Sequence, residues 1–526
     1  MMQRILVIRL SAIGDVILTS APLLNLKISH PEAKIYLLTR TKNLEIVKYM
    51  AGVDEVIPFP EDVGIITLYR IAEELDKIGF DAVIDLHGNF RSHFIAHHLA
   101  GLKVRYPKRR WERWRATQRG RRKVLNLSPP HTIDLYNQAL HQLGSEIHAH
   151  RPVINLIPTS DDPDISMIRQ PRIALAPGAS FPTKQWFLGR FEKLAQQLHE
   201  KFRAGIVVYL SENDRELFRL REHIPDEFLK FHENAPLPVL AASLSRADLL
   251  ISNDSALAHL GSAVGTPVLA LFGPTHPTLG FAPRGLRDRI IQVDEFCRPC
   301  SLHGRTRCYR EEQYCFTRIG VDDVITSAAE FLRGNFKGTP ALFVDRDGTL
   351  IKEKEFIRLP EEVEPEDGAI DAIKAVRSAG YKIIVISNQS GVARGYFDEE
   401  TVRRLNRRVL SLFREEGAPI DDILYCPHYI RGMVKEYAVR CRCRKPSSGM
   451  VDSACLKHNL NPFRSIVIGD KISDIELAYV SGARGILVRT GYGNREADKL
   501  QHKNYLKPEY IAEGILDAVK YLTGMR

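Results

Sequence analysis

Two aspartates, Asp345 and Asp347, lie two residues apart where an apolar stretch runs into a glycine turn. At the end of a parallel strand both carboxylates would point into the crevice above the sheet, where ligands bind in open α/β folds. Asp345 could then attack phosphorus and Asp347 could carry the proton, so that an aspartyl-phosphate divides the hydrolysis into two easier steps. The alternative is a solvated acidic turn, and this short motif alone does not decide between the two.

Further polar residues follow apolar stretches downstream of this pair. Ser387 and Asn388 come directly after one apolar stretch and Asp470 comes after another. Lys445 stands between them in an Arg-Lys-Pro triplet. Small polar side chains and a lysine hydrogen-bond phosphate oxygens, and carboxylates bind Mg²⁺ together with substrate phosphate. We therefore predict phosphate binding by Ser387, Asn388 and Lys445.

Together these motifs resemble those of the haloacid-dehalogenase superfamily. The resemblance implies a Rossmann-like phosphatase domain in which Asp345 is the nucleophile and Asp347 is the general acid and base. Ser387 and Lys445 would hold the phosphate. The predicted Mg²⁺ ligands are Asp345, Asp347 and Asp470.

Three cysteines and one histidine form a second candidate site in the same region. Cys426, His428, Cys441 and Cys443 are a complete tetrahedral ligand set for Zn²⁺. Because protein would fill all four positions, the site would be structural and would hold a loop beside the phosphate site. The alternative is a group of buried thiols with an unrelated histidine.

The loop that carries these ligands has a narrower resemblance. Its C-x-H and C-x-C pairs, with residues 388–395 before them and an Arg-Lys-Pro triplet after them, resemble the D-glycero-D-manno-heptose 1,7-bisphosphate 7-phosphatases. Histidinol-phosphate phosphatases share the loop, so histidinol phosphate and other sugar phosphates remain alternatives. Arg394 and Arg444 are candidates for the distal phosphate, because arginine binds phosphate through two parallel hydrogen bonds.

The length and ends of the chain set further limits. A chain of 526 residues is too long for one core and predicts about three domains. Residues 5–8 form an apolar run of only four residues before a charge, which indicates a first strand rather than a signal peptide. No apolar stretch is long enough to span a bilayer. Six of the eight cysteines lie in tight clusters with metal-like spacing, which fits a reducing compartment, so we expect a cytoplasmic protein.

The positive charge of the chain is concentrated in one segment. Residues 101–125 hold eleven Lys and Arg against one acid, Glu112, which equals the formal net charge of +10 for the whole chain. Trp111 and Trp114 alternate with the cations. The segment therefore suits polyanions or anionic lipid, through Lys108, Arg109, Arg110, Arg113 and Arg115. No nucleic-acid-binding signature accompanies it, so no nucleic-acid partner is expected. A solvated loop is the alternative.

Residues 1–335 alternate short apolar strands with helices, which predicts two doubly wound parallel sheets. The expected strands are residues 4–9, 34–38, 55–57 and 82–85 in the first sheet, and 172–176, 205–210, 249–252 and 268–272 in the second. Residues 154–170 contain several prolines and link the two sheets. A helix at about 321–333 and a linker at 336–340 follow. The predicted domains are residues 1–160, 161–335 and 341–526.

Polar residues also follow strands in this first part. Asp15 begins a helix after a turn of small residues, where it could cap the helix or deprotonate an acceptor hydroxyl. Arg91 follows another strand and could hold an anionic acceptor. A helix that begins near Asp254 presents amide groups to a phosphate, and Lys184 can neutralise a diphosphate leaving group.

The conjunction of these motifs resembles glycosyltransferase family 9, the ADP-heptose:lipopolysaccharide heptosyltransferases, which have a GT-B fold. The resemblance implies that Asp15 is the general base and that a nucleotide sugar binds between two domains. The donor-binding residues that we predict are Lys184, Asp214, Asp254, Ser255 and His259. Taken alone, His259 is more typical of a packed helical histidine.

Four further cysteines follow the second predicted sheet. Cys297, Cys300, Cys308 and Cys315 have spacings that suit zinc or an iron–sulfur cluster. Four thiols without a metal are the alternative, and no catalytic need for a metal follows from the residues.

These observations predict a bifunctional enzyme of lipopolysaccharide heptose metabolism. Its expected partners are a sugar phosphate, an ADP-sugar, a lipopolysaccharide-core acceptor and the anionic inner membrane, with Mg²⁺ and Zn²⁺ as cofactors. One alternative keeps both folds and changes the substrates to histidinol phosphate, another sugar phosphate or another nucleotide sugar. A second is a degenerate GT-B module that binds polyanions through residues 101–125.

Overall fold

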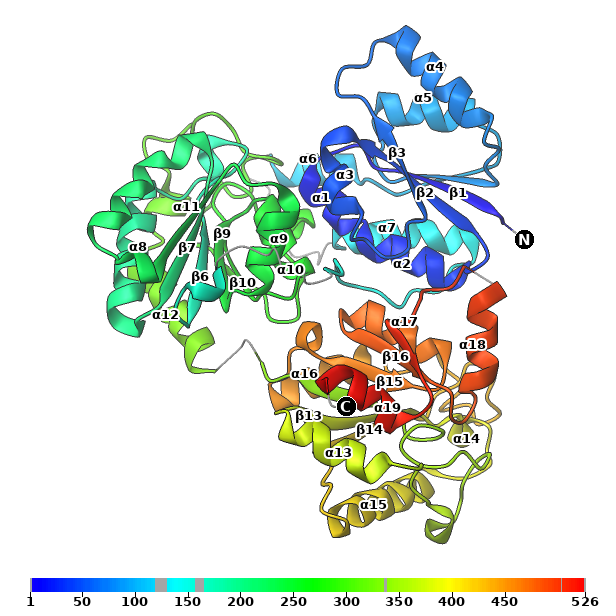
Figure 1. The fold of residues 1–526 in the computed structure, drawn as a ribbon. Coiled ribbons are helices and arrows are strands. Elements are labelled where there is room, and N and C mark those ends of the chain that lie inside the picture. The colour runs from blue at the N-terminus through cyan, green and yellow to red at the C-terminus, as the bar shows by residue number, and fades with distance from the viewer. Residues whose placement is uncertain (1, 119–129, 157–164, 335–337, 503, 525–526) are drawn as a thin grey trace. The chain divides into compact units, whose positions relative to one another are not determined.

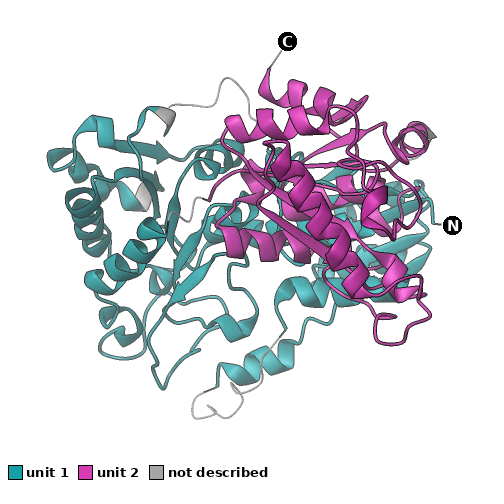
Figure 2. Ribbon diagram, turned by 90° about the horizontal axis from the view of Figure 1, so that it is seen from below, with its two compact units in different colours: residues 1–26, 33–145, 150–337 teal, residues 27–32, 146–149, 338–526 magenta. Residues whose placement is uncertain are grey.

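The computed structural model describes residues 2–118, 130–156, 165–334, 338–502 and 504–524 (Figure 1). The predicted link at 154–170, the linker at 336–340 and the basic segment at 101–125 lie partly outside the described residues. The chain forms two compact units (Figure 2). The first contains residues 1–26, 33–145 and 150–337, and the second contains residues 338–526 with the short segments 27–32 and 146–149.

The first unit contains a five-stranded sheet with the order β3-β2-β1-β4-β5. Its parallel strands are β1 (Arg4–Ile8), β2 (Lys34–Arg40), β3 (Glu55–Phe59), β4 (Ala82–Asp85) and β5 (Leu102–Arg105). The helices of this part are α1 (Ile13–Leu18), α2 (Ser20–Ser29), α3 (Leu44–Val47), α4 (Ile65–Asp76), α5 (Phe90–His98), α6 (Arg110–Ala116) and α7 (Thr132–Leu140). The central strands are apolar almost throughout because both faces of a parallel sheet are buried.

The same unit contains a six-stranded parallel sheet with the order β11-β10-β9-β6-β7-β8. Its strands are β6 (Arg172–Ala176), β7 (Gly205–Leu210), β8 (Leu229–Glu233), β9 (Leu249–Asn253), β10 (Val268–Leu271) and β11 (Arg289–Ile291). The accompanying helices are α8 (Leu188–Phe202), α9 (Leu237–Ser245), α10 (Ala256–Ala263), α11 (Tyr314–Thr317) and α12 (Val321–Arg333). Two doubly wound parallel sheets are therefore confirmed.

The second unit has a six-stranded parallel sheet with the order β14-β13-β12-β15-β16-β17. Its strands are β12 (Ala341–Val344), β13 (Lys382–Asn388), β14 (Asp422–Cys426), β15 (Ile466–Gly469), β16 (Arg484–Val488) and β17 (Tyr510–Ala512). Its helices are α13 (Ala369–Ser378), α14 (Ser390–Ala393), α15 (Glu399–Glu415), α16 (Gly449–His458), α17 (Ile472–Ser481), α18 (Gly493–His502) and α19 (Ile515–Thr523).

The order of the third sheet determines which side chains meet. Strand β12 lies in the middle, with β13 on one side and β15 on the other. Because all three strands are parallel, the residues that follow them emerge at the same edge of the sheet. Asp345 follows β12, Ser387 and Asn388 end β13, and Asp470 follows β15, so residues far apart in the sequence converge there.

Helix length and composition bear on membrane insertion. Across the described parts of the chain, none of the helices is both long enough and apolar enough to cross a bilayer.

Candidate active sites

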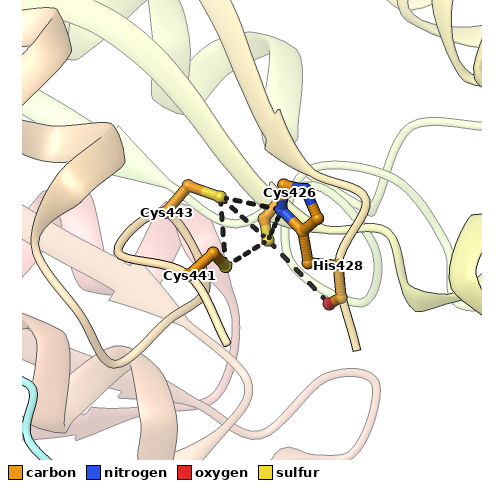
Figure 3. Close-up of side chains that lie close together, drawn as sticks. All are labelled: Cys426, His428, Cys441 and Cys443. Atoms are coloured by element: carbon orange, nitrogen blue, oxygen red, sulfur yellow. Dashed lines mark hydrogen bonds between the residues drawn. The ribbon is translucent and has the colours of Figure 1, made fainter. Parts of the chain in front are cut away.

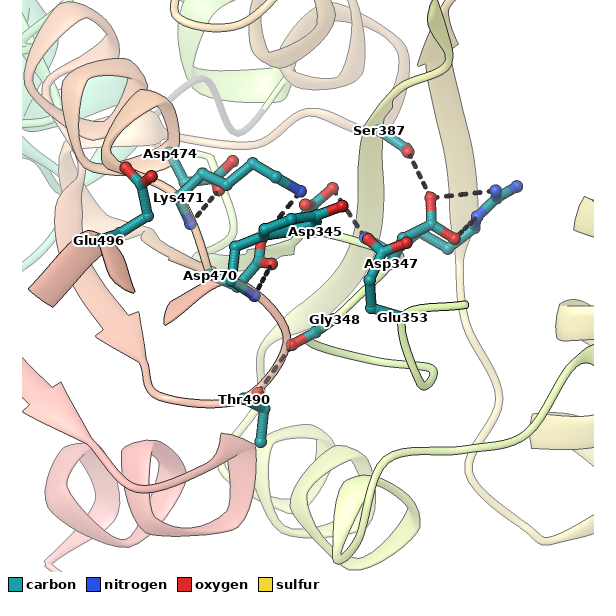
Figure 4. Close-up of polar contacts among 12 residues, drawn as sticks. Asp345, Asp347, Gly348, Glu353, Ser387, Asp470, Lys471, Asp474, Thr490 and Glu496 are labelled. Atoms are coloured by element: carbon teal, nitrogen blue, oxygen red, sulfur yellow. Dashed lines mark hydrogen bonds and ion pairs between the residues drawn. The ribbon is translucent and has the colours of Figure 1, made fainter. Parts of the chain in front are cut away.

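Three buried carboxylates come together at the edge of the third sheet. Oxygens of Asp345, Asp470 and Asp474 lie within 4.8 Å of one another (Figure 4). Asp345 is fixed to the neighbouring strand, because its amide donates to the carbonyl of Ile468 at 2.9 Å. Asp474 comes from the first turn of α17, four residues after Asp470. The result is a group of hard oxygen donors of the kind that binds Mg²⁺.

Lys445 joins two of these carboxylates. Its Nζ lies 2.7 Å from Oδ1 of Asp345 and 2.6 Å from Oδ1 of Asp474, and it donates to the carbonyl of Ile386 at 3.1 Å. Burial opposes the charged ammonium, but the two carboxylates outweigh it and raise the pKa of Lys445. Burial likewise disfavours ionised Asp345, yet Lys445 and Lys471 lower its pKa. Both groups are therefore held in their charged forms.

Asp470 and Asp474, unlike Asp345, have raised pKa values, and burial is the main cause for Asp474. Burial, followed by the Asp345 carboxylate, raises the pKa of Asp470 to about 8. Three carboxylates and two lysines leave the group one positive charge short of balance when all are ionised. A β-carbon on Gly348 would lie 2.5 Å from Asp470 Oδ2, so the turn after Asp347 approaches this carboxylate closely. The donor set and its charge fit a divalent cation.

The carboxylate of Asp347 faces away from this group. It accepts a hydrogen bond from Ser387 Oγ at 3.4 Å (Figure 4). It also accepts one from Gln389 Nε2 at 2.8 Å and pairs with Arg346 Nε at 3.0 Å. Two of the three predicted Mg²⁺ ligands, Asp345 and Asp470, therefore lie in the group of carboxylates. The third carboxylate of the group is Asp474, whereas the side chain of the third predicted ligand, Asp347, lies beside Ser387.

Asn388 contacts the backbone of the lysine rather than open space. Its Oδ1 accepts from the amide of Lys445 at 3.0 Å, and its Nδ2 donates to the carbonyl of Lys445 at 3.2 Å. Both ends of the side-chain amide are thus used to position Lys445. The prediction placed Asn388 on the phosphate, whereas this geometry gives it a supporting contact.

Two arginines lie over one aromatic ring. The guanidinium carbons of Arg394 and Arg444 are 4.5 Å and 5.1 Å from the centroid of Tyr429. Arg444 also donates to the carbonyl of His428 at 3.1 Å. Arg394 Nε is buried without a hydrogen-bond partner among the described residues. Two cations on one ring repel each other, and an anion between them would offset that repulsion.

The predicted zinc ligands are close together in space (Figure 3). Cys443 Sγ lies 3.2 Å from Cys426 Sγ and 3.3 Å from Cys441 Sγ, and Cys426 Sγ lies 3.5 Å from Cys441 Sγ. His428 Nδ1 is 3.3 Å from Cys443 Sγ and 3.7 Å from Cys426 Sγ. Ligands around one tetrahedral Zn²⁺ stand roughly 3.5–3.8 Å apart. The four side chains therefore fit a closed zinc site.

Asp15 forms an ion pair with Arg9, which follows β1. Arg9 is buried, donates to the carbonyl of Leu86 at 2.6 Å and lies over the ring of Tyr136. Ala12 occupies the N-cap of α1 and no side chain caps that end. The helix-cap alternative for Asp15 is therefore not what the structure shows. Arg9 was not among the predicted site residues, although a cation that ends an apolar strand was visible in the sequence.

Several predicted donor residues gather near Asp15. Lys184 Nζ lies 2.8 Å from Asp254 Oδ2, and the same oxygen accepts from Thr275 Oγ1 at 2.7 Å. His259 lies on α10, and a β-carbon on Gly14 would come within 2.8 Å of its ring. The helix that carries Asp15 thus meets the helix that begins after Asp254.

The other predicted residues of this half have different surroundings. Ser255 is the N-cap residue of α10, and its Oγ lies 3.1 Å from Ser252 Oγ. Asp214 is buried, and its Oδ2 accepts a hydrogen bond from the amide of Ser211 at 3.1 Å. This hydrogen bond caps the helical turn that follows Ser211. Arg91 donates to the carbonyl of Val63 at 3.3 Å.

The four cysteines after the second sheet line one small pocket. Cys297, Cys300, Cys308 and Cys315 line it together with Arg298. Two groups of possible metal ligands in the described residues have all their ligand atoms within 4.8 Å of one another, and these four sulfurs are in neither group. The pocket therefore lacks the tight ligand geometry of the site at Cys426.

Comparison with known proteins assigns both parts of the chain. Residues 68–308 match the model of glycosyltransferase family 9 (heptosyltransferase), and residues 442–518 match a HAD-hydrolase-like model. Over 188 residues the chain is 38% identical to the D-glycero-D-manno-heptose-1,7-bisphosphate 7-phosphatase of Thermosynechococcus vestitus, covering 35% of this chain and 95% of that protein. The chain belongs to the heptose-bisphosphate phosphatase family. The preceding glycosyltransferase domain makes it a fusion of two enzymes.

The chain is also similar to two further proteins. The D-glycero-alpha-D-manno-heptose-1,7-bisphosphate 7-phosphatase of Photorhabdus laumondii is 41% identical over 155 residues, which are 29% of this chain and 85% of that protein. The crystal structure of a family 9 glycosyl transferase from Veillonella parvula covers 63% of this chain and 97% of its own, with 22% identity and a TM-score of 0.48.

Proposed function

We propose that the phosphatase part removes the 7-phosphate of D-glycero-D-manno-heptose 1,7-bisphosphate. The support is the group of Asp345, Asp470 and Asp474 around Lys445, together with the identity to the phosphatase relatives. The transferase part would move heptose from ADP-heptose to a lipopolysaccharide-core acceptor with inversion. The proposed domains are residues 1–160, 161–335 and 341–526, with a linker at 336–340.

In the proposed hydrolysis, a carboxylate oxygen of Asp345 attacks phosphorus and the bond to the sugar oxygen breaks. Asp347 gives its proton to that oxygen, and the phosphoryl group remains on Asp345. Asp347 then takes a proton from a water molecule, whose oxygen attacks phosphorus. The bond between phosphorus and the Asp345 oxygen breaks, which releases inorganic phosphate and restores both side chains. Gln389 and Ser387 would hold the Asp347 carboxylate in place for these proton transfers through their hydrogen bonds.

Two metals complete the proposed phosphatase site. Asp345, Asp470 and Asp474 would hold Mg²⁺, which when bound neutralises charge on the transferring phosphoryl group. Cys426, His428, Cys441 and Cys443 would hold Zn²⁺ and so fix the loop from which Arg444 projects. Arg394 and Arg444 would bind the phosphate that is not removed.

In the proposed transfer, Asp15 takes the proton of an acceptor hydroxyl, whose oxygen attacks the anomeric carbon of heptose. The bond from that carbon to ADP breaks on the opposite face. Lys184 would pair with the diphosphate as it leaves, exchanging its contact with Asp254. The ion pair with Arg9 would hold Asp15 in place.

The acceptor would be presented at the cytoplasmic face of the anionic inner membrane. The described part of the basic segment shows exposed Arg110 and Arg115, whereas Arg113 is buried and its guanidinium carbon lies 4.4 Å from the centroid of the Phe281 ring. Arg113 therefore does not face a partner as the sequence suggested. Residues 119–125 lie outside the described residues.

Phosphate release from a panel of substrates tests the phosphatase assignment. The panel contains heptose 1,7-bisphosphate, histidinol phosphate and hexose phosphates, with Mg²⁺ present. The highest kcat/KM is expected for heptose 1,7-bisphosphate. A preference for histidinol phosphate would support the main alternative instead.

A further inference from the structure

Large apolar side chains are exposed where α4 and α5 begin. Ile65 and Ile66 start α4 and are 74% and 72% exposed, with Tyr69 also exposed one turn later. Phe90 starts α5 and is 70% exposed. Scattered apolar side chains are normal on a protein surface, but a connected set marks an interaction site.

These side chains are connected through a row of rings. Helices α4 and α5 pack beside each other (Figure 1). Along α5 the rings of Phe90 and Phe94 lie 6.5 Å apart, and those of Phe94 and His98 lie 6.3 Å apart. The Tyr69 ring of α4 is 5.3 Å from the His98 ring. The two helices therefore share one aromatic and aliphatic surface.

Helix α6 begins beside the start of α5. Arg110, its first residue, donates to the carbonyl of Gly88, two residues before Phe90. Trp111 is 65% exposed and stacks on exposed Trp114, with ring centroids 4.8 Å apart. Two stacked indoles in water are uncommon, because aromatic side chains of this size normally bury most of their area.

Cations outnumber acids beside the two tryptophans. The exposed cations of β5 and α6 are Lys103, Arg105, Arg110 and Arg115, and the exposed acid of these two elements is Glu112, which pairs with Arg109 at 2.6 Å. Helix α4 carries exposed Arg70 together with exposed Glu73, Glu74 and Asp76. The surface thus combines aliphatic side chains on α4 with indoles and an excess of positive charge on β5 and α6.

We propose that Ile65, Ile66, Tyr69, Phe90, Trp111 and Trp114 form a docking face that inserts into an anionic lipid bilayer. Tryptophan and tyrosine favour the membrane–water interface, and cations are attracted to anionic headgroups. The proposal rests on the proposed function in that a membrane-embedded acceptor requires the transferase to reach the bilayer. The proposal adds that aliphatic side chains of α4 insert into the bilayer, a contact that the basic segment alone does not provide.

Vesicle sedimentation of the full chain tests insertion separately from charge. Vesicles of phosphatidylcholine with phosphatidylglycerol contain no acceptor, so binding does not depend on sugar transfer. The double variant Ile65→Ser, Ile66→Ser should bind about tenfold or more weakly, because two partly inserted isoleucines lose transfer free energy of that order. The matched control Met167→Ser, Leu456→Ser changes side chains that are 76% and 62% exposed elsewhere, and it should bind as the wild type does.

Intrinsic fluorescence reports on α6 directly. The chain has three tryptophans, and Trp186 is fully buried. Vesicles should therefore shift the emission of Trp111 and Trp114 to shorter wavelength, and lipids brominated in the acyl chain should quench it. The variant Trp111→Phe, Trp114→Phe should lose both effects.

Three results would overturn the proposal. One is equal vesicle binding by the isoleucine variant and the wild type, and another is emission that brominated lipid does not quench. The third is a concentration-dependent dimer that Ile65→Ser, Ile66→Ser abolishes, which would make the face an interface between copies of the chain. Failure of heptose transfer to a soluble acceptor, with vesicle binding intact, would instead contradict the proposed transferase activity.

Discussion

Lys445 lies 2.7 Å from the carboxylate of Asp345, and both side chains are almost completely buried. The lysine also contacts Asp474 and is fixed through its backbone by Asn388. The proposed nucleophile is therefore held by a cation that comes from the loop after the cysteine–histidine cluster. This contact couples the chemistry of the phosphatase to the placement of that loop.

Removal of the lysine should damage both activity and stability. Lys445→Met leaves Asp345 and Asp474 without their cation, and breaking one side of a buried ion pair costs about 3–5 kcal/mol. Phosphate release should fall about a hundredfold or more, because an electrostatic contact to the reacting group is lost. Thermal unfolding and phosphate release measure the two effects. Lys457→Met, an exposed lysine on α16, is the control, and equal behaviour of both variants would contradict the role of Lys445.

Gln389 should act through Asp347. Gln389→Leu removes the 2.8 Å hydrogen bond that holds the Asp347 carboxylate, so proton transfer to the leaving oxygen should slow. We expect kcat to fall about tenfold, at the low end of general acid–base effects, with KM nearly unchanged. Steady-state kinetics measure both constants. A large rise in KM at unchanged kcat would instead place Gln389 in substrate binding.

Zinc should depend on one cysteine of the cluster and not on another cysteine nearby. Cys443→Ser removes the thiol that lies closest to the other ligands, so purified protein should lose most of its zinc. Cys455→Ser changes a buried cysteine on α16 outside the cluster and should keep it. Elemental analysis of both variants decides this, and equal zinc contents would contradict the site.

Arg9 should be needed for sugar transfer. Arg9→Met removes the cation that holds Asp15, so heptose transfer should fall about a hundredfold while phosphate release is unchanged. Arg4→Met changes an arginine at the other end of the same strand and should transfer normally. Transfer by Arg9→Met at the rate of the control would remove Arg9 from the site.

The strands that the sequence predicted are those with continuous apolar runs. In the first two sheets β5, β8 and β11 were not predicted, and all three lie at sheet edges. Edge strands have one side in solvent and carry polar residues, as in Leu102–Arg105, so they lack the apolar run that marks a buried strand. The central strands, and hence the residues that follow them, were therefore the predictable part.

The side-chain contacts within the sites were harder to predict. Residues after neighbouring parallel strands must converge, so Asp345, Ser387 and Asp470 could be grouped in advance. Which way each side chain points depends on partners brought in by the fold. Asn388 faces the Lys445 backbone, and Arg113 packs on the ring of Phe281. Neither partner is visible in the sequence around those residues.

A paired assay of one protein preparation tests the central claim that the chain holds two separate enzymes. Phosphate release from heptose 1,7-bisphosphate and heptose transfer from ADP-heptose are measured for the wild type, Asp345→Asn and Asp15→Asn. The wild type should show both activities, Asp345→Asn should lose only phosphate release, and Asp15→Asn should lose only transfer. A wild type with one activity, or a variant that loses both while remaining folded, would contradict the account.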